Sequence, residues 1–314
     1  MKQPRVVARL LLSLSLALAG ATGVTGCKKD QSTTGDVAQA AQGGFAEGYN
    51  KLNNGPRKLL KDYFGAIDEA TGPTEKYRGM GGAFTVERDI TDAKKSFAEA
   101  KAATPASMKD MPPLADAALA GAEKVWAVYA EIAKYNEAEN FKDDKFEKGK
   151  KLHADMIAAR DVFNTAIDKF SAALDAVENV QSEAELKKQK PDTMGYWFRF
   201  ANMEAKKFIG QITKPEDVAG VKAAVKAGFP AWDKVAQDVA AFPAGKASTG
   251  VFKSYADAVA RFAATATKLN RNVDDPKTDA DDVSSAIASL ISDYNSLVSL
   301  HNTLIEAEAG GYLK

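Results

Sequence analysis

Apolar residues in the last part of the chain recur every three or four positions. Between residues 279 and 308 they step alternately by four and three positions, which places them on one face of a helix. The residues on this face are Val283, Ile287, Leu290, Tyr294, Leu297, His301 and Leu304. Thr278 or Asp279 can cap the start of such a helix, and Gly310 and Gly311 can end it. The pattern therefore predicts one long amphipathic helix over 279–308.

The same spacing occurs in most of the remaining chain, without a convincing alternating run that would indicate strands. Residues 144–186 and 118–136 predict two more long helices, which the segment 141–144 joins as antiparallel neighbours. Shorter helices are predicted over 45–70, 88–103, 194–212, 215–242 and 250–272. We therefore expect an all-α fold, an elongated multi-helix bundle with long antiparallel helices, and a single helical domain over 45–314.

The predicted helix 194–212 differs from the others because apolar residues lie on two of its faces. One stripe contains Met194, Phe198, Ala201, Ala205, Phe208 and Ile212. The other contains Tyr196, Phe200 and Met203. A helix that is apolar on two faces usually lies in the centre of a bundle. The alternative is an aromatic groove near 196–208 that binds a small molecule or a metal ion, with Tyr196, Trp197 and Phe200 as candidate ligand-binding residues.

The N-terminal residues 1–26 have the pattern of a secretory signal peptide. Lys2, Arg5 and Arg9 precede an apolar run over 10–19, and small residues follow. This apolar run is about half of the ~20 residues that a transmembrane helix needs. The pattern therefore favours a signal peptide over a permanent membrane helix.

The chain has a single cysteine, and it follows this segment directly. Residues 24–27, Val-Thr-Gly-Cys, resemble the lipobox of bacterial lipoproteins, whose cysteine is lipidated and becomes the mature N-terminus. We expect lipidated Cys27 to hold the protein on a lipid bilayer, with a flexible tether over 27–44. Lys28 and Lys29 follow the cysteine. By resemblance to lipoproteins of bacteria with two membranes, this favours the outer membrane, with the body facing the periplasm.

Charge and composition exclude several classes of function. The chain has 42 basic and 42 acidic residues, so it lacks the basic surplus of nucleic-acid-binding proteins, and we expect no nucleic acid as a partner. It has two histidines and no His-x-x-x-His or His-Glu-x-x-His pair, so we expect no metal and no cofactor. His301 lies in an apolar stripe and His153 in a charged helical surface, and both are interpreted as structural. No catalytic motif stands out, and we expect no enzymatic activity.

One loop comes close to a calcium-binding pattern. The residues at positions 1, 3, 5, 9 and 12 of an EF-hand loop would be Asn270, Asn272, Asp274, Thr278 and Asp281. Position 6 requires glycine but holds Asp275, and position 12 has aspartate in place of the bidentate glutamate. The pattern therefore favours an acidic linker that caps a helix over a calcium site.

Two longer stretches of the sequence resemble a known family. YNEAENFKDDKFEKGKKLH over 135–153 and LISDYNSLVSLHN over 290–302 resemble the YiiG-like bacterial lipoproteins, and the resemblance covers roughly 45–308. It implies a helical, envelope-anchored protein built around a domain of unknown function, and it supplies no catalytic residues. We therefore predict a non-enzymatic lipoprotein that binds an unidentified envelope protein or glycan.

Overall fold

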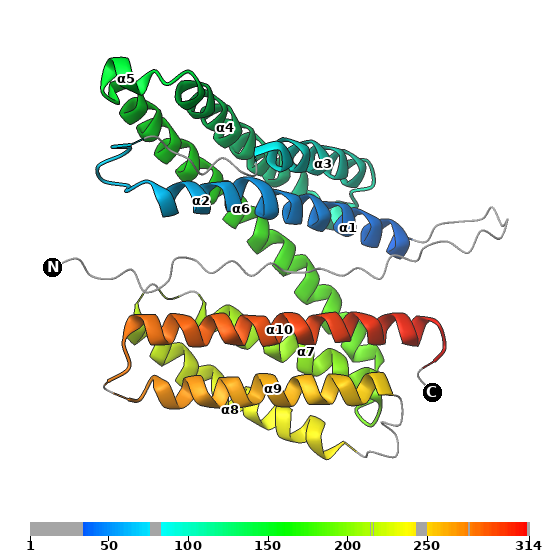
Figure 1. The fold of residues 1–314 in the computed structure, drawn as a ribbon. Coiled ribbons are helices and arrows are strands. Elements are labelled where there is room, and N and C mark those ends of the chain that lie inside the picture. Colours follow the sequence, from blue (N-terminus) through cyan, green and yellow to red (C-terminus); the bar gives the residue numbers. More distant parts are fainter. Residues whose placement is uncertain are drawn as a thin grey trace. The chain divides into compact units, whose positions relative to one another are not determined.

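The structure is a computed structural model that describes residues 34–75, 83–213, 215, 217–242, 250–275 and 277–312. The predicted signal peptide over 1–26, Cys27 and the first part of the predicted tether lie outside these residues. Figure 1 shows the described elements with the labels used below.

Every regular element in the described residues is a helix, which confirms the all-α prediction. The elements are α1 (Thr34–Leu52), the π-helical turn η1 (Asn53–Arg57), α2 (Lys58–Ala66), α3 (Ala83–Ala102), the 3-10 turn η2 (Ala106–Met108), α4 (Met111–Glu137), α5 (Phe141–Asp144), α6 (Glu147–Lys188), α7 (Met194–Ile212), α8 (Val218–Ala241), α9 (Gly250–Asn272) and α10 (Ala280–Ala309). None of the helices in this part of the chain is both long enough and apolar enough to cross a membrane.

The described residues form two compact units, in place of the single domain that the sequence pattern predicts. The first unit contains the described residues up to Glu178, and the second begins at Asn179. The helix α6 continues without a break across this boundary. Because one unbroken helix belongs to both units, the spacing of apolar residues along the sequence does not indicate where one unit ends and the next begins.

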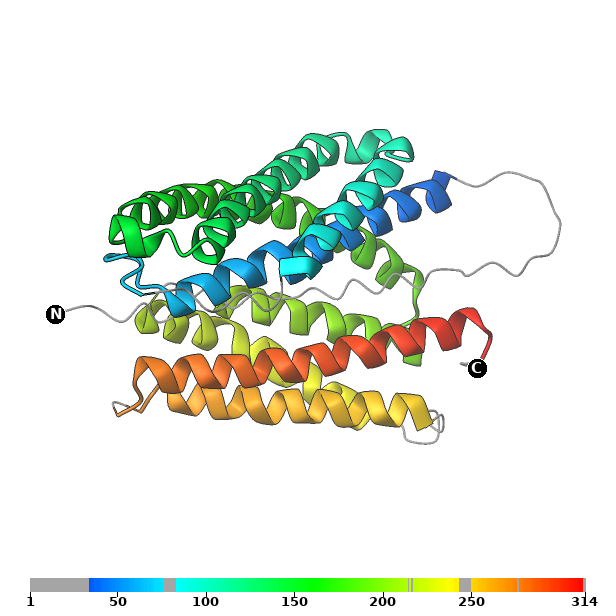
Figure 2. The ribbon, with the colours of Figure 1, turned by 45° about the horizontal axis from the view of Figure 1, so that its top comes forward.

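The core of the first unit is built from aromatic residues on three helices. Phe45 of α1, Phe97 of α3 and Phe170 of α6 are fully buried, and their ring centroids lie 5.3 to 6.3 Å apart. α1 and α3 lie side by side in both views (Figures 1 and 2). They run antiparallel, because Gly44 of α1 faces Ala100 of α3 and Gly48 of α1 faces Phe97.

The flexible tether predicted over 27–44 is wrong from Thr34 onward, because α1 begins there. Ala41 and Gln42 are buried against the rest of the unit. At Gly44 the helices are so close that an added Cβ would lie 2.9 Å from the Cβ of Ala100. The small residues that have the composition of a linker therefore allow close helix packing instead.

The core of the second unit converges on one phenylalanine of α9. The ring of Phe262 contacts Phe208 of α7 at 6.4 Å, Trp232 of α8 at 4.7 Å and Tyr294 of α10 at 6.4 Å between centroids. The start of α10 is closed by a capping box in which Asp279 accepts from the Asp282 amide at 2.9 Å. This N-cap is one of the two residues that the sequence predicts.

Candidate functional site

The three candidate ligand-binding residues lie together near the start of α7. Thr193 caps this helix by accepting a hydrogen bond from the Tyr196 amide at 3.2 Å. Tyr196 stacks on Phe200 at a centroid distance of 5.4 Å, and Trp197 contacts the two rings edge-on at 5.3 and 6.1 Å. All three side chains are half-buried. The structure thus brings the predicted residues into one aromatic cluster whose rings contact one another.

The opposite face of the same stretch belongs to the core. Phe198, Ala201, Ala205 and Phe208 are buried, as the first apolar stripe predicts. The guanidinium carbon of Arg199 lies 4.6 Å from the centroid of the Phe198 ring, a cation–π contact, and Arg199 forms an ion pair with Glu308 of α10. A ligand or partner at 196–208 would therefore meet the face that carries the three aromatic rings.

His301 connects α10 to this part of α7. Its Nδ1 lies 3.2 Å from the carbonyl oxygen of Phe198, which also accepts a hydrogen bond from the Tyr255 hydroxyl at 2.8 Å. Because a carbonyl oxygen only accepts, Nδ1 carries the proton and donates it. Burial lowers the pKa of His301 to about 4, and the positive charge of Arg199 acts in the same direction. His301 is therefore neutral at pH 7 and packs against α7.

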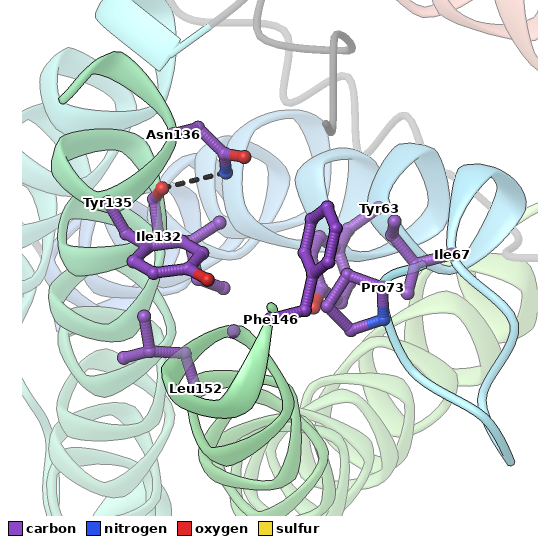
Figure 3. A pocket seen from close by; sticks show the side chains of 9 residues that line it. Tyr63, Ile67, Pro73, Ile132, Tyr135, Asn136, Phe146 and Leu152 are labelled. Atoms are coloured by element: carbon purple, nitrogen blue, oxygen red, sulfur yellow. Dashed lines mark hydrogen bonds between the residues drawn. The ribbon is translucent and has the colours of Figure 1, made fainter. Parts of the chain in front are cut away.

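A small cavity lies in the first unit between α2, α4 and α6 (Figure 3). Its volume, measured as the space open to the centre of a water molecule, is about 10 Å³. This is close to the ~10–15 Å³ that a single water needs. The cavity is lined by Tyr63, Ile67, Pro73, Ile132, Tyr135, Asn136, Phe146, Gly149 and Leu152. All of these side chains are uncharged at neutral pH.

The segment 135–153, which carries part of the family resemblance, forms one side of this cavity. The Tyr135 hydroxyl donates to Asp144 at 2.7 Å, and Asp144 also accepts from the amides of Phe146 and Lys148 at 2.9 and 3.1 Å. Burial, and then the hydrogen bond to Asp144, raise the pKa of Tyr135 to about 12. Burial alone would raise the pKa of Asp144, but its hydrogen bonds outweigh this effect and lower it. The Asp144 carboxylate thus ties the end of α4 to the start of α6.

The connection between α4 and α6 has an unusual backbone. Glu139, Lys145 and Phe146 adopt left-handed conformations with φ of 53°, 51° and 70°. Such conformations cost about 1–3 kcal/mol each in residues other than glycine and tend to occur at functional sites. The surroundings hold Phe146 in place, because Asp144 accepts from its amide and its ring stacks on Phe141 at 5.2 Å. Nothing in the sequence marks these positions, since none of them is glycine.

His153 is buried, and its predicted place in a charged surface is wrong. Its Nδ1 lies 2.9 Å from the Tyr63 hydroxyl and its Nε2 lies 3.0 Å from the carbonyl oxygen of Glu69. Nε2 therefore donates to the carbonyl, and Nδ1 accepts from Tyr63. The charged neighbours in the sequence hid the spacing that places His153 on the same helix face as Leu152 and Met156, which are also buried.

The loop that resembles an EF-hand holds an ammonium group of the protein itself. Lys226 of α8 donates to the side-chain oxygen of Asn270 at 2.8 Å, to the carbonyl oxygen of Asn270 at 3.1 Å, and to Asp274. The hydrogen bond from Lys226 lowers the pKa of Asp274. Within the residues that the structure describes, no three His, Cys, Asp or Glu side chains gather in a way that could hold a metal ion.

Most of the chain matches one protein family. The family model described as a protein of unknown function (DUF3829) matches residues 45–303. A relative described as "Uncharacterized protein YiiG", from Escherichia coli (strain K12), is 28% identical over 182 residues, which cover 57% of this chain and 51% of the relative. The match therefore spans about half the length of that relative. No solved structure matches the chain significantly. The chain belongs to the DUF3829 family and is similar to YiiG, as the stretches over 135–153 and 290–302 indicate.

Proposed function

We propose that this protein is a lipid-anchored, non-enzymatic binding module of the cell envelope. The observation that carries the proposal is the position of Cys27, the single cysteine, directly after a signal-like segment and at the end of a Val-Thr-Gly-Cys lipobox. A cysteine with two or more acyl chains is a stable anchor, whereas one chain binds only marginally. Lys28 and Lys29 after the cysteine favour the outer membrane, with the body in the periplasm.

The start of α1 limits how far the first unit can lie from such an anchor. Only the six residues 28–33 separate Cys27 from Thr34, where α1 begins. A fully extended chain advances at most ~3.6 Å per residue, so the seven steps from Cys27 to Thr34 span no more than about 25 Å. A lipidated protein would therefore hold its first unit near the bilayer, where partners are envelope proteins or glycans.

The aromatic cluster of Tyr196, Trp197 and Phe200 supports a binding role. Tyrosine, tryptophan and phenylalanine are enriched in protein interfaces because they supply a large contact area. Here the three rings are half-buried on a regular helix whose other face is locked in a core. The alternative function, binding of a small molecule or metal ion near 196–208, would use the same rings.

Replacement of Cys27 by serine tests the anchor. Lipidation requires the thiol, so the Cys27→Ser protein should move from the membrane fraction to the soluble fraction when cells are lysed. Ser32→Ala, a change in the same segment that keeps the cysteine, should leave the protein in the membrane fraction. If the Cys27→Ser protein stays in the membrane fraction, the proposed anchor is wrong.

Crosslinking in intact cells tests the binding role. A photoreactive amino acid at position 197 should produce a discrete adduct with one envelope protein or with glycan. The same label in place of Lys234, which is exposed on α8, serves as the control and should not produce that adduct. Adducts that are absent at 197, or identical at both positions, would count against a partner at the aromatic cluster.

A further inference from the structure

The cavity of the first unit points to a second binding site, separate from both the anchor and the aromatic cluster of α7. We propose that the cavity between α2, α4 and α6 binds a small, neutral, ring-shaped molecule with a hydrogen-bond donor, and that Phe146 closes this site as an internal plug. By plug we mean a side chain that occupies the place of the ligand until the ligand displaces it.

The walls of the cavity define the class of ligand. In Figure 3, the rings of Tyr135 and Phe146 lie on opposite sides, and Asn136 and Leu152 lie on the other two. Ring faces and aliphatic side chains favour an apolar, flat molecule. Among the described residues that line the cavity, none carries a charge at neutral pH, and a charged ligand would lose its hydration without gaining an ionic partner from them. The ligand is therefore neutral.

The polar atoms of the walls favour a donor on the ligand. The hydroxyl protons of Tyr135 and Tyr63 are engaged with Asp144 and with Nδ1 of His153, respectively. Asn136 is oriented by the bond from its Nδ2 to the carbonyl oxygen of Ile132 at 2.8 Å, so its Oδ1 is the side-chain atom that accepts. The Oδ1 atom of Asn136 can therefore accept a hydrogen bond from a ligand, which matches an N–H or O–H group.

Phe146 explains how a cavity with room for one water could admit a ring. It lies in the turn between α5 and α6, outside both helices, and its side chain is half-buried. Outward rotation of this residue would vacate the volume of one aromatic ring beside the existing cavity. Enclosed apolar cavities of about 150 Å³ bind benzene, so the enlarged site would suit a single-ring or indole-sized ligand.

The backbone of the turn makes this displacement easier. Lys145 and Phe146 have φ of 51° and 70° in the closed state, and both are residues with a Cβ. Such conformations are strained and persist only because the surroundings hold them, here through the Asp144–Phe146 hydrogen bond and the Phe141 ring. Opening of the turn would relieve part of this strain and offset part of the packing that the Phe146 ring loses.

Calorimetric titration with indole tests the site, using the full chain with Cys27→Ser as the parent protein. Indole is neutral, has one N–H donor and matches the proposed size, whereas 1-methylindole lacks the donor. The apparent affinity of the ligand is proportional to the fraction of protein molecules in which Phe146 has left the site. Phe146→Ala removes the plug, so this variant should bind indole at least about tenfold more tightly than the parent. Phe229→Ala, which removes a half-buried phenylalanine of the second unit, should bind indole as the parent does.

The same titrations contain the results that would overturn the proposal. If folded Phe146→Ala binds indole no more tightly than the parent, Phe146 is not a plug. An equal gain in Phe229→Ala would show nonspecific apolar binding. Equal affinities of Phe146→Ala for indole and 1-methylindole would overturn the proposed donor. Should circular dichroism show that Phe146→Ala does not fold, Phe146→Leu carries the same prediction with a gain of about threefold, since leucine fills less of the site. None of these outcomes depends on lipidation of Cys27.

Discussion

His301 makes the stability of the folded protein depend on pH. Its pKa is about 4 in the folded state, whereas the ordinary value is 6.5. Well above pH 6.5 the ring is neutral in both states and contributes nothing to the pH dependence. As the pH falls from 6.5 towards 4, the unfolded chain takes up a proton that the folded chain does not bind, so the stability falls. The difference between the folded and unfolded pKa values lowers the free energy of unfolding by about 3 kcal/mol once the pH is below 4.

The variant His301→Asn isolates this effect. The asparagine amide places an N–H group close to the position of Nδ1, so the bond to the Phe198 carbonyl is kept and the titration is removed. Urea unfolding between pH 7 and pH 4 should show a smaller loss of stability for the variant than for the wild-type protein. Parallel loss in the two proteins would contradict the low pKa of His301.

Contacts between single residues could be predicted from the sequence where all of the residues lie on one helix. Phe200 meets both Tyr196 and Trp197 because positions three and four apart are neighbours on a helix, which is a property of local geometry. His153 shows the limit of this reasoning. Its partners Tyr63 and Glu69 lie more than eighty positions away, and its charged sequence neighbours point away from the core while the imidazole points into it.

At the scale of elements, the spacing of apolar residues and the capping residues predict the observed bounds of several helices. The predicted 194–212 and 250–272 coincide with α7 and α9, and 279–308 matches α10 to within one residue at each end. The start of α8 differs, because Asp217 caps it and it begins at Val218 instead of 215. The helix over 34–44 was missed because alanine and glycine suit both a linker and a tight helix contact. The choice between a linker and a packed helix depends on α3, against which this segment packs and which is distant in the sequence.

The cavity could not be predicted from the sequence for a related reason. Its walls come from three helices and from residues in the connections next to them, and the helical residues would also fit an ordinary apolar core stripe. The resemblance over 135–153 marks one of the segments that build it but does not show what this segment encloses. The left-handed turn at Lys145 and Phe146 is held by Asp144 and Phe141, so a tertiary arrangement, and not a glycine, specifies its backbone.

At the scale of the whole molecule, two separate sets of buried residues predict two separate unfolding steps. The core of the first unit includes Phe97, and that of the second includes Phe262, in distinct clusters. A Cβ at Gly48 of α1 would lie 2.2 Å from the fully buried ring of Phe97. Gly48→Ala should therefore destabilise the first unit by about 1–3 kcal/mol. Beyond the neighbouring backbone of its own helix, no atom of the described residues lies within 4 Å of a Cβ added at Gly210 in α7, so Gly210→Ala should stabilise the second unit by about 0.5–1 kcal/mol.

Scanning calorimetry on the full Cys27→Ser chain distinguishes these two effects. We expect two transitions, of which Gly48→Ala lowers one and Gly210→Ala raises the other. Gly65→Ala, in α2 of the first unit, is the matched control, because its added Cβ also has no contact within 4 Å in the described part of the chain outside its own helix backbone. It should raise the same transition that Gly48→Ala lowers. If all three variants shift one common transition, the two cores unfold together, and the unbroken helix α6, which runs through both units, becomes the element that couples them.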